Sequence, residues 1–330
     1  MTEKGISYIL PHLRPARLCQ NDVTMSFVLG IDGGGSKTTA AVSDGVYVLA
    51  THTASGCNLN SVAPSDAQSA LAEAVHGALN SAGVSAADVT NVCAGVAGAA
   101  SPETAAKIAE MIAALLPRAE VQIAGDTAIA LDAEFRGGSG VVCISGTGSI
   151  AFGRNERGDL ARAGGWGRFV SDEGSGHWIG QCTVAECLHA LDMGRSSSLI
   201  AGIMHHWHIA TREQLVQHCN RDQIPNFSDL VPVVLKAEKD GDALACDILT
   251  TAGTRLARVA QIVLRRLWVG RSPVEVVITG GVFMNSTRVR QIFSNVIRSD
   301  RPEVSIRLSE REPYMGAIYL AHQRAQGASK

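Results

Sequence analysis

The chain has 330 residues, of which 46% are hydrophobic and 18% charged, and its formal net charge is −2 at pH 7. This length can bury the cores of two domains of ordinary size. The near-neutral charge gives no reason to expect nucleic acid or an anionic membrane surface as a partner. No apolar run reaches the roughly 18 residues of a membrane-spanning helix.

The first half of the chain alternates strands with helices. We predict strands, in chain order, at 27–32, 39–44, 46–51, 89–96 and 120–124, and helices at 65–81 and 102–116. Pro64 and Gly83 mark the two ends of the first helix. Such alternation is typical of an α/β fold. Residues 1–24 lack the features of a secretory signal, and we expect a poorly ordered leader or an over-called start.

The second half is more helical. It begins with two strands around a turn at 141–153, and the later elements are predicted as helices at 171–193, 198–209, 212–220, 230–238, 242–267 and 314–325, with strands at 274–279 and 304–308. We place a domain boundary between Gly125 and Asp126, which gives domains at 25–125 and 126–313. The closing helix at 314–325 is a candidate for completing the first domain.

The stretch GIDGGGSKTTAAV, residues 30–42, has a glycine-rich turn followed by lysine and threonine, but it is not a P-loop. A P-loop needs glycine directly before the lysine and again five residues earlier. Here Ser36 precedes Lys37, and Ile31 occupies the earlier position. The residues after Lys37 also predict a strand, whereas a P-loop lysine begins a helix. The stretch is therefore a strand, a tight turn and a second strand.

The same arrangement recurs in VVCISGTGSIAFG, residues 141–153, and a third glycine turn ends the strand in VEVVITGG, residues 274–281. Glycine turns let backbone N–H groups surround an anion. One such turn is explained by a tight hairpin alone. Two matching turns that face each other across a cleft could clamp the β- and γ-phosphates of a nucleotide, and the third turn could seat the nucleoside.

These pieces resemble the sugar kinase, Hsp70 and actin superfamily, above all its N-acetylglucosamine kinase-like branch, which also contains the BadF/BadG/BcrA/BcrD-type ATPases. The resemblance runs from about Phe27 to Ala325. It is carried by GIDGGGSKT, GDTAIAL, ISGTGS, GGWGRFVSDEGSGHWIG, ITGGV and EPYMGAIYLA. It implies an α/β protein of two ribonuclease-H-like (actin/hexokinase-like) domains, with ATP and sugar bound in the cleft between them.

The resemblance also implies nucleotide contacts. The implied first phosphate loop is Gly34, Gly35, Ser36, Lys37 and Thr38, the second is Gly146, Thr147, Gly148 and Ser149, and the adenosine position is Gly280, Gly281, Met284 and Asn285. Asp32 falls where related proteins hold Mg²⁺ largely through its waters, which suits an ion that dehydrates reluctantly. Ser36 departs from the threonine that is frequent at its position, a change too small to abolish phosphate binding.

Asp126 falls on the family's catalytic-base position, where it would accept the proton of the sugar hydroxyl. The alternative is a helix N-cap, a common role of aspartate. The implied sugar contacts are Asn58, Asp126, Thr147, Trp166, Gly167 and Asp172. Asn60 competes with Asn58 for its position, and a plain turn residue is the alternative for either. The predicted helix at 171–193 puts Asp172 in its first turn.

The favoured function is an ATP- and Mg²⁺-dependent amino-sugar kinase that phosphorylates a hydroxyl, O6 by preference, of N-acetylglucosamine or a close relative. Glucosamine and N-acetylmuramic acid remain open as substrates, and a homodimer is a candidate assembly. One alternative is a BadF-type ATPase that activates a redox partner through a shared iron–sulfur cluster, but no two of the eight cysteines lie in a suitable glycine-rich context. A second alternative is a non-catalytic nucleotide-binding regulator.

The remaining motifs predict no further site. The cysteines contain no C-x-x-C pair, so we expect reduced thiols in a cytoplasmic protein. The HHWH stretch at 205–208 lacks the carboxylate or cysteine partners of a metal site. The arginines at 255–267 belong to the solvated face of a helix whose other face is apolar.

Overall fold

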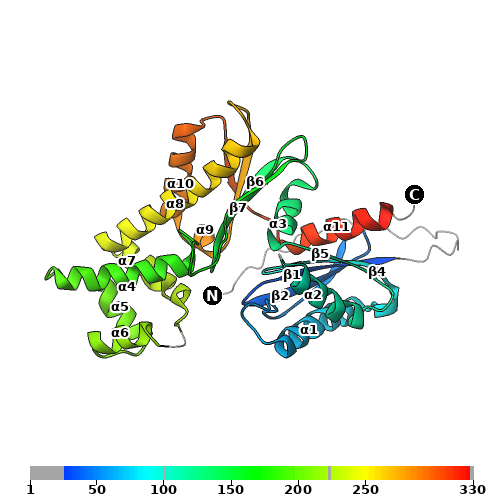
Figure 1. Cartoon of the computed structure of the whole chain (residues 1–330), viewed down its shortest axis with the longest axis horizontal. Coiled ribbons are helices and arrows are strands. Elements are labelled where there is room, and N and C mark those ends of the chain that lie inside the picture. The colour runs from blue at the N-terminus through cyan, green and yellow to red at the C-terminus, as the bar shows by residue number, and fades with distance from the viewer. Residues whose placement is uncertain (1–25, 100, 196, 222–223, 328–330) are drawn as a thin grey trace, which may run out of the picture.

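The protein consists of two five-stranded sheets with helices packed against them, as seen in a computed structural model that describes residues 26–99, 101–195, 197–221 and 224–327 (Figure 1). The leader predicted at 1–24 lies outside the described residues. The first sheet contains β1 (Phe27–Gly33), β2 (Lys37–Ser43), β3 (Val48–Ser55), β4 (Val89–Val96) and β5 (Glu120–Ala124). The second contains β6 (Gly140–Ser145), β7 (Ser149–Arg154), β8 (Leu160–Gly164), β9 (Glu275–Thr279) and β10 (Ser305–Leu308).

Both sheets have the same topology. The strand order is β3-β2-β1-β4-β5 in the first and β8-β7-β6-β9-β10 in the second, when the second is read from its β8 edge. In each sheet the first three strands form an antiparallel meander, and the last two join parallel to the first. The repeat predicted from the two glycine turns therefore extends to whole sheets, and the α/β class is confirmed.

One face of the first sheet is covered by α1 (Pro64–Ala82), which packs on β2 and β3, while α2 (Pro102–Leu115) packs on β5. Proline at the first helical position opens α1, and Gly83 at φ 65° closes it. The buried face of α1 consists of small and aliphatic residues at helical spacing, namely Ala67, Ala70, Leu71, Ala74, Val75, Ala78 and Leu79.

Helices α3 (Asp126–Phe135) and α11 (Tyr314–Gly327) lie together between the two sheets (Figure 1). Helix α11 returns from the end of the chain to pack on β1 and β4 of the first sheet. A Cβ atom on Gly316 would stand 1.8 Å from the carbonyl oxygen of Ile129, so this glycine lets α11 and α3 touch backbone to backbone. On its other side, α3 buries Ala130 and Leu131 against β6 and β9 of the second sheet.

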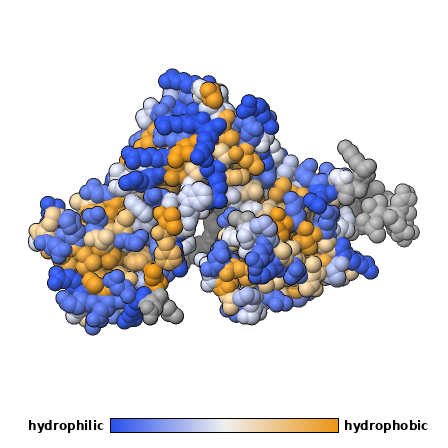
Figure 2. All heavy atoms as spheres, in the orientation of Figure 1, coloured by the Kyte–Doolittle hydropathy of each residue, from blue (hydrophilic) through white to orange (hydrophobic). Residues whose placement is uncertain are grey.

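The other helices belong to the second half. They are α4 (Gly176–Asp192), α5 (Ser198–His206), α6 (Arg212–Cys219), α7 (Val231–Lys239), α8 (Ala243–Leu267), α9 (Gly281–Asn285) and α10 (Thr287–Asp300), with short 3₁₀ turns at Ala86–Asp88 and Phe227–Leu230. Helices α4 to α7 form a group beside the second sheet (Figure 1). The surface is hollowed between this half and the first (Figure 2). No helix in the described ranges is long and apolar enough to cross a bilayer.

Three sequence predictions differ from the structure. The helix expected at 171–193 begins only at Gly176, because Gly174 adopts φ 79° and the Ser175 hydroxyl caps the helix by accepting the N–H of Trp178 at 3.1 Å. Asp172 thus lies in the loop before α4, and placing it in the first turn was wrong. The strand expected at 46–51 is β3, at Val48–Ser55, and both β8 and α10 were missed.

Candidate active site

The first glycine turn joins β1 to β2 and is held from two sides. The N–H of Gly34 donates across the turn to the Lys37 carbonyl at 2.8 Å. The N–H of Cys57 donates to the Gly34 carbonyl at 3.1 Å, and that of Ala97 donates to the Gly33 carbonyl at 2.8 Å. The N–H groups of Gly35 and Ser36 are exposed and donate to no described residue. Such a pair of free donors in a turn suits a phosphate.

The second glycine turn joins β6 to β7 and repeats this arrangement. The N–H of Gly146 donates across the turn to the Gly148 carbonyl at 2.9 Å, and the N–H of Gly176 donates to the Gly146 carbonyl at 2.7 Å. The N–H of His177 donates to the Thr147 carbonyl at 3.3 Å. Within the described residues, the N–H groups of Thr147 and Gly148 are again without an acceptor. Ser149 is fixed by its hydroxyl, which donates to the Glu173 carbonyl at 3.0 Å.

The third glycine turn follows β9 and touches the second turn. Gly280 has φ 98°, and a Cβ atom there would stand 2.3 Å from the Ser145 carbonyl oxygen, so only glycine fits. After it, α9 carries Met284 and Asn285 on the surface, and the Asn285 amide donates to the Gly281 carbonyl at 2.8 Å. The structure therefore brings together the residues predicted for the second phosphate loop and for adenosine.

Carboxylates gather beside the first turn. Burial raises the pKa of Asp32 to about 6, Lys37 opposes the rise, and the negative charges of Asp126 and Glu312 add to it. Each of these groups is therefore within electrostatic reach of Asp32. Glu312 was not predicted as a site residue, although it opens the EPYMG stretch that carries part of the family resemblance. The structure places Glu312 near Asp32 because α11, which follows Glu312, packs on β1.

Asp126 is the first residue of α3, and the N-cap of that helix is Gly125. The carboxylate is thus not the cap that its position in the sequence also allowed. Its Oδ1 accepts the N–H of Thr127 at 2.9 Å. Burial raises its pKa, while hydrogen bonds from the backbone N–H groups of Thr127 and of its own residue, and the charge of Arg162, work against the rise. A carboxylate with a raised pKa is a better proton acceptor once it is ionised.

The carboxylates beside the first turn suit Mg²⁺ if the substrate phosphates and waters supply its other ligands. Among the described residues, no cluster of three or more histidine, cysteine, aspartate or glutamate side chains could hold a metal ion by itself. Mg²⁺ in phosphoryl-transfer sites is usually bound by one or two carboxylates, with substrate phosphates and waters as the other ligands. Asp32 and Asp126 offer this minimal oxygen set. A cation would offset both the burial that raises the pKa of Asp32 and the smaller contribution from the negative charges of Asp126 and Glu312.

The loop between β8 and α4 carries three predicted sugar contacts. Trp166 is 62% exposed, and the guanidinium of Arg162 lies 4.3 Å from the centre of its ring. Gly167 has φ 96° and pairs with Ser171. Asp172 lies against the second glycine turn, since a Cβ on Gly148 would meet its Oδ2 at 2.9 Å. Arg162 also acts on Asp126, so this loop is linked electrostatically to the carboxylate cluster.

Asn58 lies elsewhere, in the segment after β3. Its Oδ1 accepts the N–H of Asn60 at 2.9 Å, as in an Asx turn, and both asparagine side chains face Gly98. This hydrogen bond supports the alternative interpretation of Asn58 as a turn residue. Its amide nitrogen donates to no described residue, which leaves a donor for a ligand. Its backbone carbonyl accepts the N–H groups of Ser61 and Val62, which also belong to the first half of the chain.

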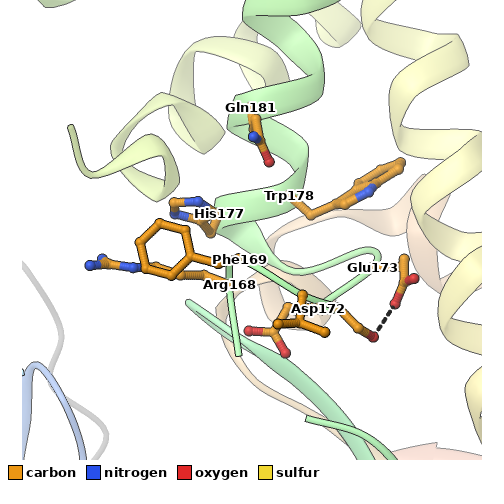
Figure 3. Close-up of a pocket in the computed structure, with 9 residues that line it drawn as sticks. Arg168, Phe169, Asp172, Glu173, His177, Trp178 and Gln181 are labelled. Atoms are coloured by element: carbon orange, nitrogen blue, oxygen red, sulfur yellow. Dashed lines mark hydrogen bonds between the residues drawn. The ribbon is translucent and has the colours of Figure 1, made fainter. Parts of the chain in front are cut away.

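A cavity of about 160 Å³ opens next to Asp172 (Figure 3). It is lined by Arg168, Phe169, Val170, Ser171, Asp172, Glu173, His177, Trp178 and Gln181. Glu173 lies at one side of it, where it accepts a hydrogen bond from the Ser171 hydroxyl at 2.8 Å. Burial raises the pKa of Asp172, and the backbone N–H groups of Ser149 and Gly167 oppose the rise. Asp172 is thus both part of the cavity wall and a neighbour of the second glycine turn.

The repeated sheet with paired glycine turns defines a two-domain protein of the actin-like sugar kinase fold. A crystal structure from Chromobacterium violaceum, assigned as an N-acetylglucosamine kinase, has a TM-score of 0.74 at 22% identity and covers 90% of this chain and 99% of its own. A ROK family glucokinase from Streptomyces griseus, solved with glucose and AMPPNP, has a TM-score of 0.58 at 17% identity, with 92% and 100% covered. These likenesses establish the fold.

The chain belongs to the BadF/BadG/BcrA/BcrD ATPase family, because its residues 29–321 match the sequence pattern of that family. It is 31% identical over 301 residues to the N-acetylmuramic acid/N-acetylglucosamine kinase of Clostridium acetobutylicum, which covers 90% of this chain and 98% of that protein. It is 29% identical over 308 residues to the N-acetyl-D-glucosamine kinase of Dictyostelium discoideum, with 89% and 97% covered. The family resemblance found in the motifs is confirmed.

Proposed function

We propose that the protein is an ATP-dependent amino-sugar kinase that transfers the γ-phosphate of ATP to a hydroxyl of N-acetylglucosamine or a close relative, by preference O6. The observation that carries this proposal is the electrostatic interaction of Asp126 with Asp32, which stands just before the first glycine turn, and with Arg162, in a protein whose sheet and glycine turn are repeated. The curated relatives, which match along nearly their whole length, carry the names of kinases of the same sugars.

In this proposal the glycine turns position the phosphates and Asp126 positions the acceptor. The free N–H groups of Gly35, Ser36, Thr147 and Gly148 bind the phosphate oxygens. The Asp126 carboxylate accepts the proton of the sugar hydroxyl as its oxygen attacks the γ-phosphorus, and ADP leaves. Closure of the cleft excludes water, which would otherwise compete with the sugar as acceptor.

Mg²⁺ would lie near Asp32, where it neutralises charge on the phosphates. Lys37 and Arg162 supply the positive charges that lower the pKa of Asp32 and of Asp126, respectively, against the effect of burial. We place Trp166, Gly167 and Asp172 around the sugar, with Asn58 as a further candidate donor. Met284 and Asn285 would flank adenosine, on the surface that follows the third turn.

Other parts of the proposal concern the setting of the enzyme. We place it in the cytoplasm, where ATP is available and thiols stay reduced, because the seven described cysteines are all free. A homodimer is the assembly we would test first by light scattering, since it is a candidate on the family resemblance.

The deciding experiment measures ADP release from ATP with and without Mg²⁺, using N-acetylglucosamine, glucosamine, N-acetylmuramic acid, glucose or no sugar. We expect strong stimulation by one amino sugar, and mass spectrometry should detect its monophosphate. D126N should abolish the stimulation, whereas D247N, which changes an exposed aspartate on α8, should not. Hydrolysis of ATP that ignores every sugar would contradict the proposal and favour an ATPase that serves a protein partner.

A further inference from the structure

Arg162 belongs to β8 and lies just before the β8–α4 loop, residues 165–175. Its partner in the antiparallel register is Phe152 of β7, so the two side chains share one face of the second sheet. Phe152 packs on that face against the cluster that includes buried residues of α3. The next residue, Ala163, faces the other way, into the core that contains α8. Arg162 therefore lies on the face of the sheet that α3 covers.

The guanidinium of Arg162 holds the start of the β8–α4 loop. Its Nη2 donates to the carbonyl of Gly165 at 2.8 Å and to that of Gly164 at 3.3 Å. Gly164 and Gly165 have φ of 72° and 68°, so the chain turns away from the strand at these two residues. The guanidinium carbon also lies over the ring of Trp166, 4.3 Å from its centre. One side chain thus contacts three successive residues.

The same guanidinium carries a buried donor without an acceptor. The Nε of Arg162 is shielded from solvent and has no hydrogen-bond partner among the described residues. A buried polar atom in this state costs free energy, and most such atoms in native proteins are hydrogen-bonded. Exceptions of this kind are expected where a residue serves function rather than stability. The unpaired Nε therefore favours a functional role for the contacts that the rest of the guanidinium makes.

The charge of Arg162 also acts on the proposed catalytic base. Burial raises the pKa of Asp126, and the positive charge of Arg162 is one of the effects that oppose the rise. Arg162 is therefore within electrostatic reach of the base while it contacts Trp166, a predicted sugar contact. A sugar bound between the base and the loop is aligned only if the two keep a fixed separation. A misplacement of about 1 Å can lower the rate about 100-fold.

We propose that Arg162 is a positioning residue of the phosphoryl transfer, which holds the β8–α4 loop at a fixed place relative to Asp126 and so aligns the acceptor hydroxyl with the base. The inference rests on the proposed function and adds a residue to it. Arginine suits this role better than lysine, because its planar fork can bond neighbouring carbonyl oxygens and stack on an indole at the same time. R162K keeps a positive charge near Asp126 but cannot make these contacts together.

Steady-state kinetics separate the geometry of Arg162 from its charge. In R162K we expect kcat with the preferred sugar to fall about tenfold and the KM for that sugar to rise about tenfold, because the loop is no longer held. The KM for ATP should stay within about twofold, since neither phosphate-binding turn contacts the guanidinium. R157K, the same change at an exposed position between β7 and β8, should alter none of these values.

Cleavage of the loop by chymotrypsin tests the same contacts without ATP or sugar. Chymotrypsin cuts after aromatic residues, and Phe169 in this loop is 69% exposed. We expect R162K to speed cleavage after Phe169 about fivefold, because the rate follows the fraction of molecules in which the loop is released. Mass spectrometry identifies the fragments, and R157K should match the wild type.

A second variant keeps the inference testable if R162K folds poorly. W166L removes the stacked ring and leaves Arg162 in place, so we expect cleavage after Phe169 to become about twofold faster. The double variant R162K/W166L should be cleaved more slowly than the product of the two single effects predicts, because both changes remove the same stacking contact.

The outcomes distinguish this inference from the proposed function. Faster cleavage in R162K together with the lower kcat and the higher KM for the sugar supports it. Normal turnover by the wild type with unchanged kinetics in R162K overturns the inference alone, since charge without the fork then suffices. Unchanged cleavage in R162K and W166L also overturns it, because Arg162 then does not hold the loop. A wild-type protein that phosphorylates no sugar overturns both.

Discussion

The two halves of the molecule share a sheet topology and a glycine turn, yet they differ in the segment that follows the third strand. In the first half, β3 ends at Ser55 and Cys57 already holds the turn through its N–H. In the second half, β8 ends at Gly164, and the equivalent bond comes from Gly176. The intervening residues 165–175 carry three of the predicted sugar contacts, Trp166, Gly167 and Asp172. The glycine turn is thus duplicated, whereas the long loop that carries Trp166, Gly167 and Asp172 occurs in the second half only.

The halves also differ in charge at equivalent places. Asp32 stands just before the first turn, and Ser145 stands at the matching position before the second. Ser145 is fully buried, and its hydroxyl donates to the Gly174 carbonyl at 2.9 Å, so it supports the loop. Asp32 instead faces Asp126 and Glu312. Duplication of a backbone therefore does not duplicate the chemistry, which depends on the side chains at a few strand ends.

The largest expected effect on activity is at Asp126, and it tests whether the reaction depends on the carboxylates that the second half lacks at the equivalent places. We expect D126N to lower kcat by about 10³-fold, because a general base usually contributes 10²- to 10⁴-fold. The KM for ATP should change little, since the phosphate-binding turns are untouched. Steady-state kinetics with the preferred sugar measure both values. A kcat within about threefold of the wild type would show that Asp126 is not the base.

The second prediction concerns Asp32, for which activity and stability should move in opposite directions. We expect D32N to lower kcat by about 10²-fold through weaker Mg²⁺ binding. The pKa of Asp32 is raised in the folded state to about 6, so its ionised form is disfavoured by folding. At pH 7 the substitution should therefore stabilise the protein, by on the order of 2 kcal/mol. Urea unfolding without nucleotide measures this gain, and a loss of stability would contradict it.

The same shift predicts a pH dependence with a definite sign. Between the unfolded pKa of 3.8 and the folded pKa of about 6, the native state holds the proton more tightly at Asp32 than the unfolded state does. This group thus stabilises the fold as the pH falls through that window, and the contribution is lost as the pH rises through 6. The difference in unfolding free energy between wild type and D32N should accordingly shrink from pH 7 to pH 4. Activity should fall over the same range, because the carboxylate loses its charge.

A third prediction compares how tightly the two turns are held. A Cβ on Gly56 would stand 2.2 Å from the Gly35 carbonyl oxygen in the first turn, whereas one on Gly176 would stand 3.1 Å from the Gly146 oxygen in the second. G56A must displace its turn, so we expect kcat/KM for ATP to fall by about 30-fold. G176A needs only a small adjustment and should cost less than about fivefold. Equal losses of kcat/KM in G56A and G176A would mean that the two turns are held equally tightly.

The smallest expected effect is at Trp166, which belongs to the segment present in one half only. Its stacking on Arg162 at a 4.3 Å distance is a partly exposed cation–π contact, worth about 0.5–1 kcal/mol. We expect W166A to raise the KM for the sugar by about three- to fivefold and to leave the KM for ATP unchanged. A rise in the KM for ATP alone would place Trp166 on the nucleotide side of the site.

Much of the fold could be predicted because its signals are local. The strands at 27–33 and 89–96 are apolar runs, and α1 has both a periodic face and residues that begin and end it. Helix α10 was missed although its signals are equally local, since Ser286 caps it and Val289, Phe293 and Ile297 are its buried face. Strand β8 gave little signal, because its sequence is short and only one of its residues is buried.

The sequence by itself determined the repeated glycine turns, and with them the family, the α/β class and the residues proposed to bind phosphate. Only the tertiary structure decided which side chains act on one another. Asp32 and Glu312 are 280 positions apart, and they meet because α11 packs on β1. The pKa of Asp126 likewise depends on its burial and on the charge of Arg162, which is 36 positions away. The physical reason is that backbone conformation is set mainly by neighbours in sequence, whereas burial and electrostatic coupling are set by neighbours in space.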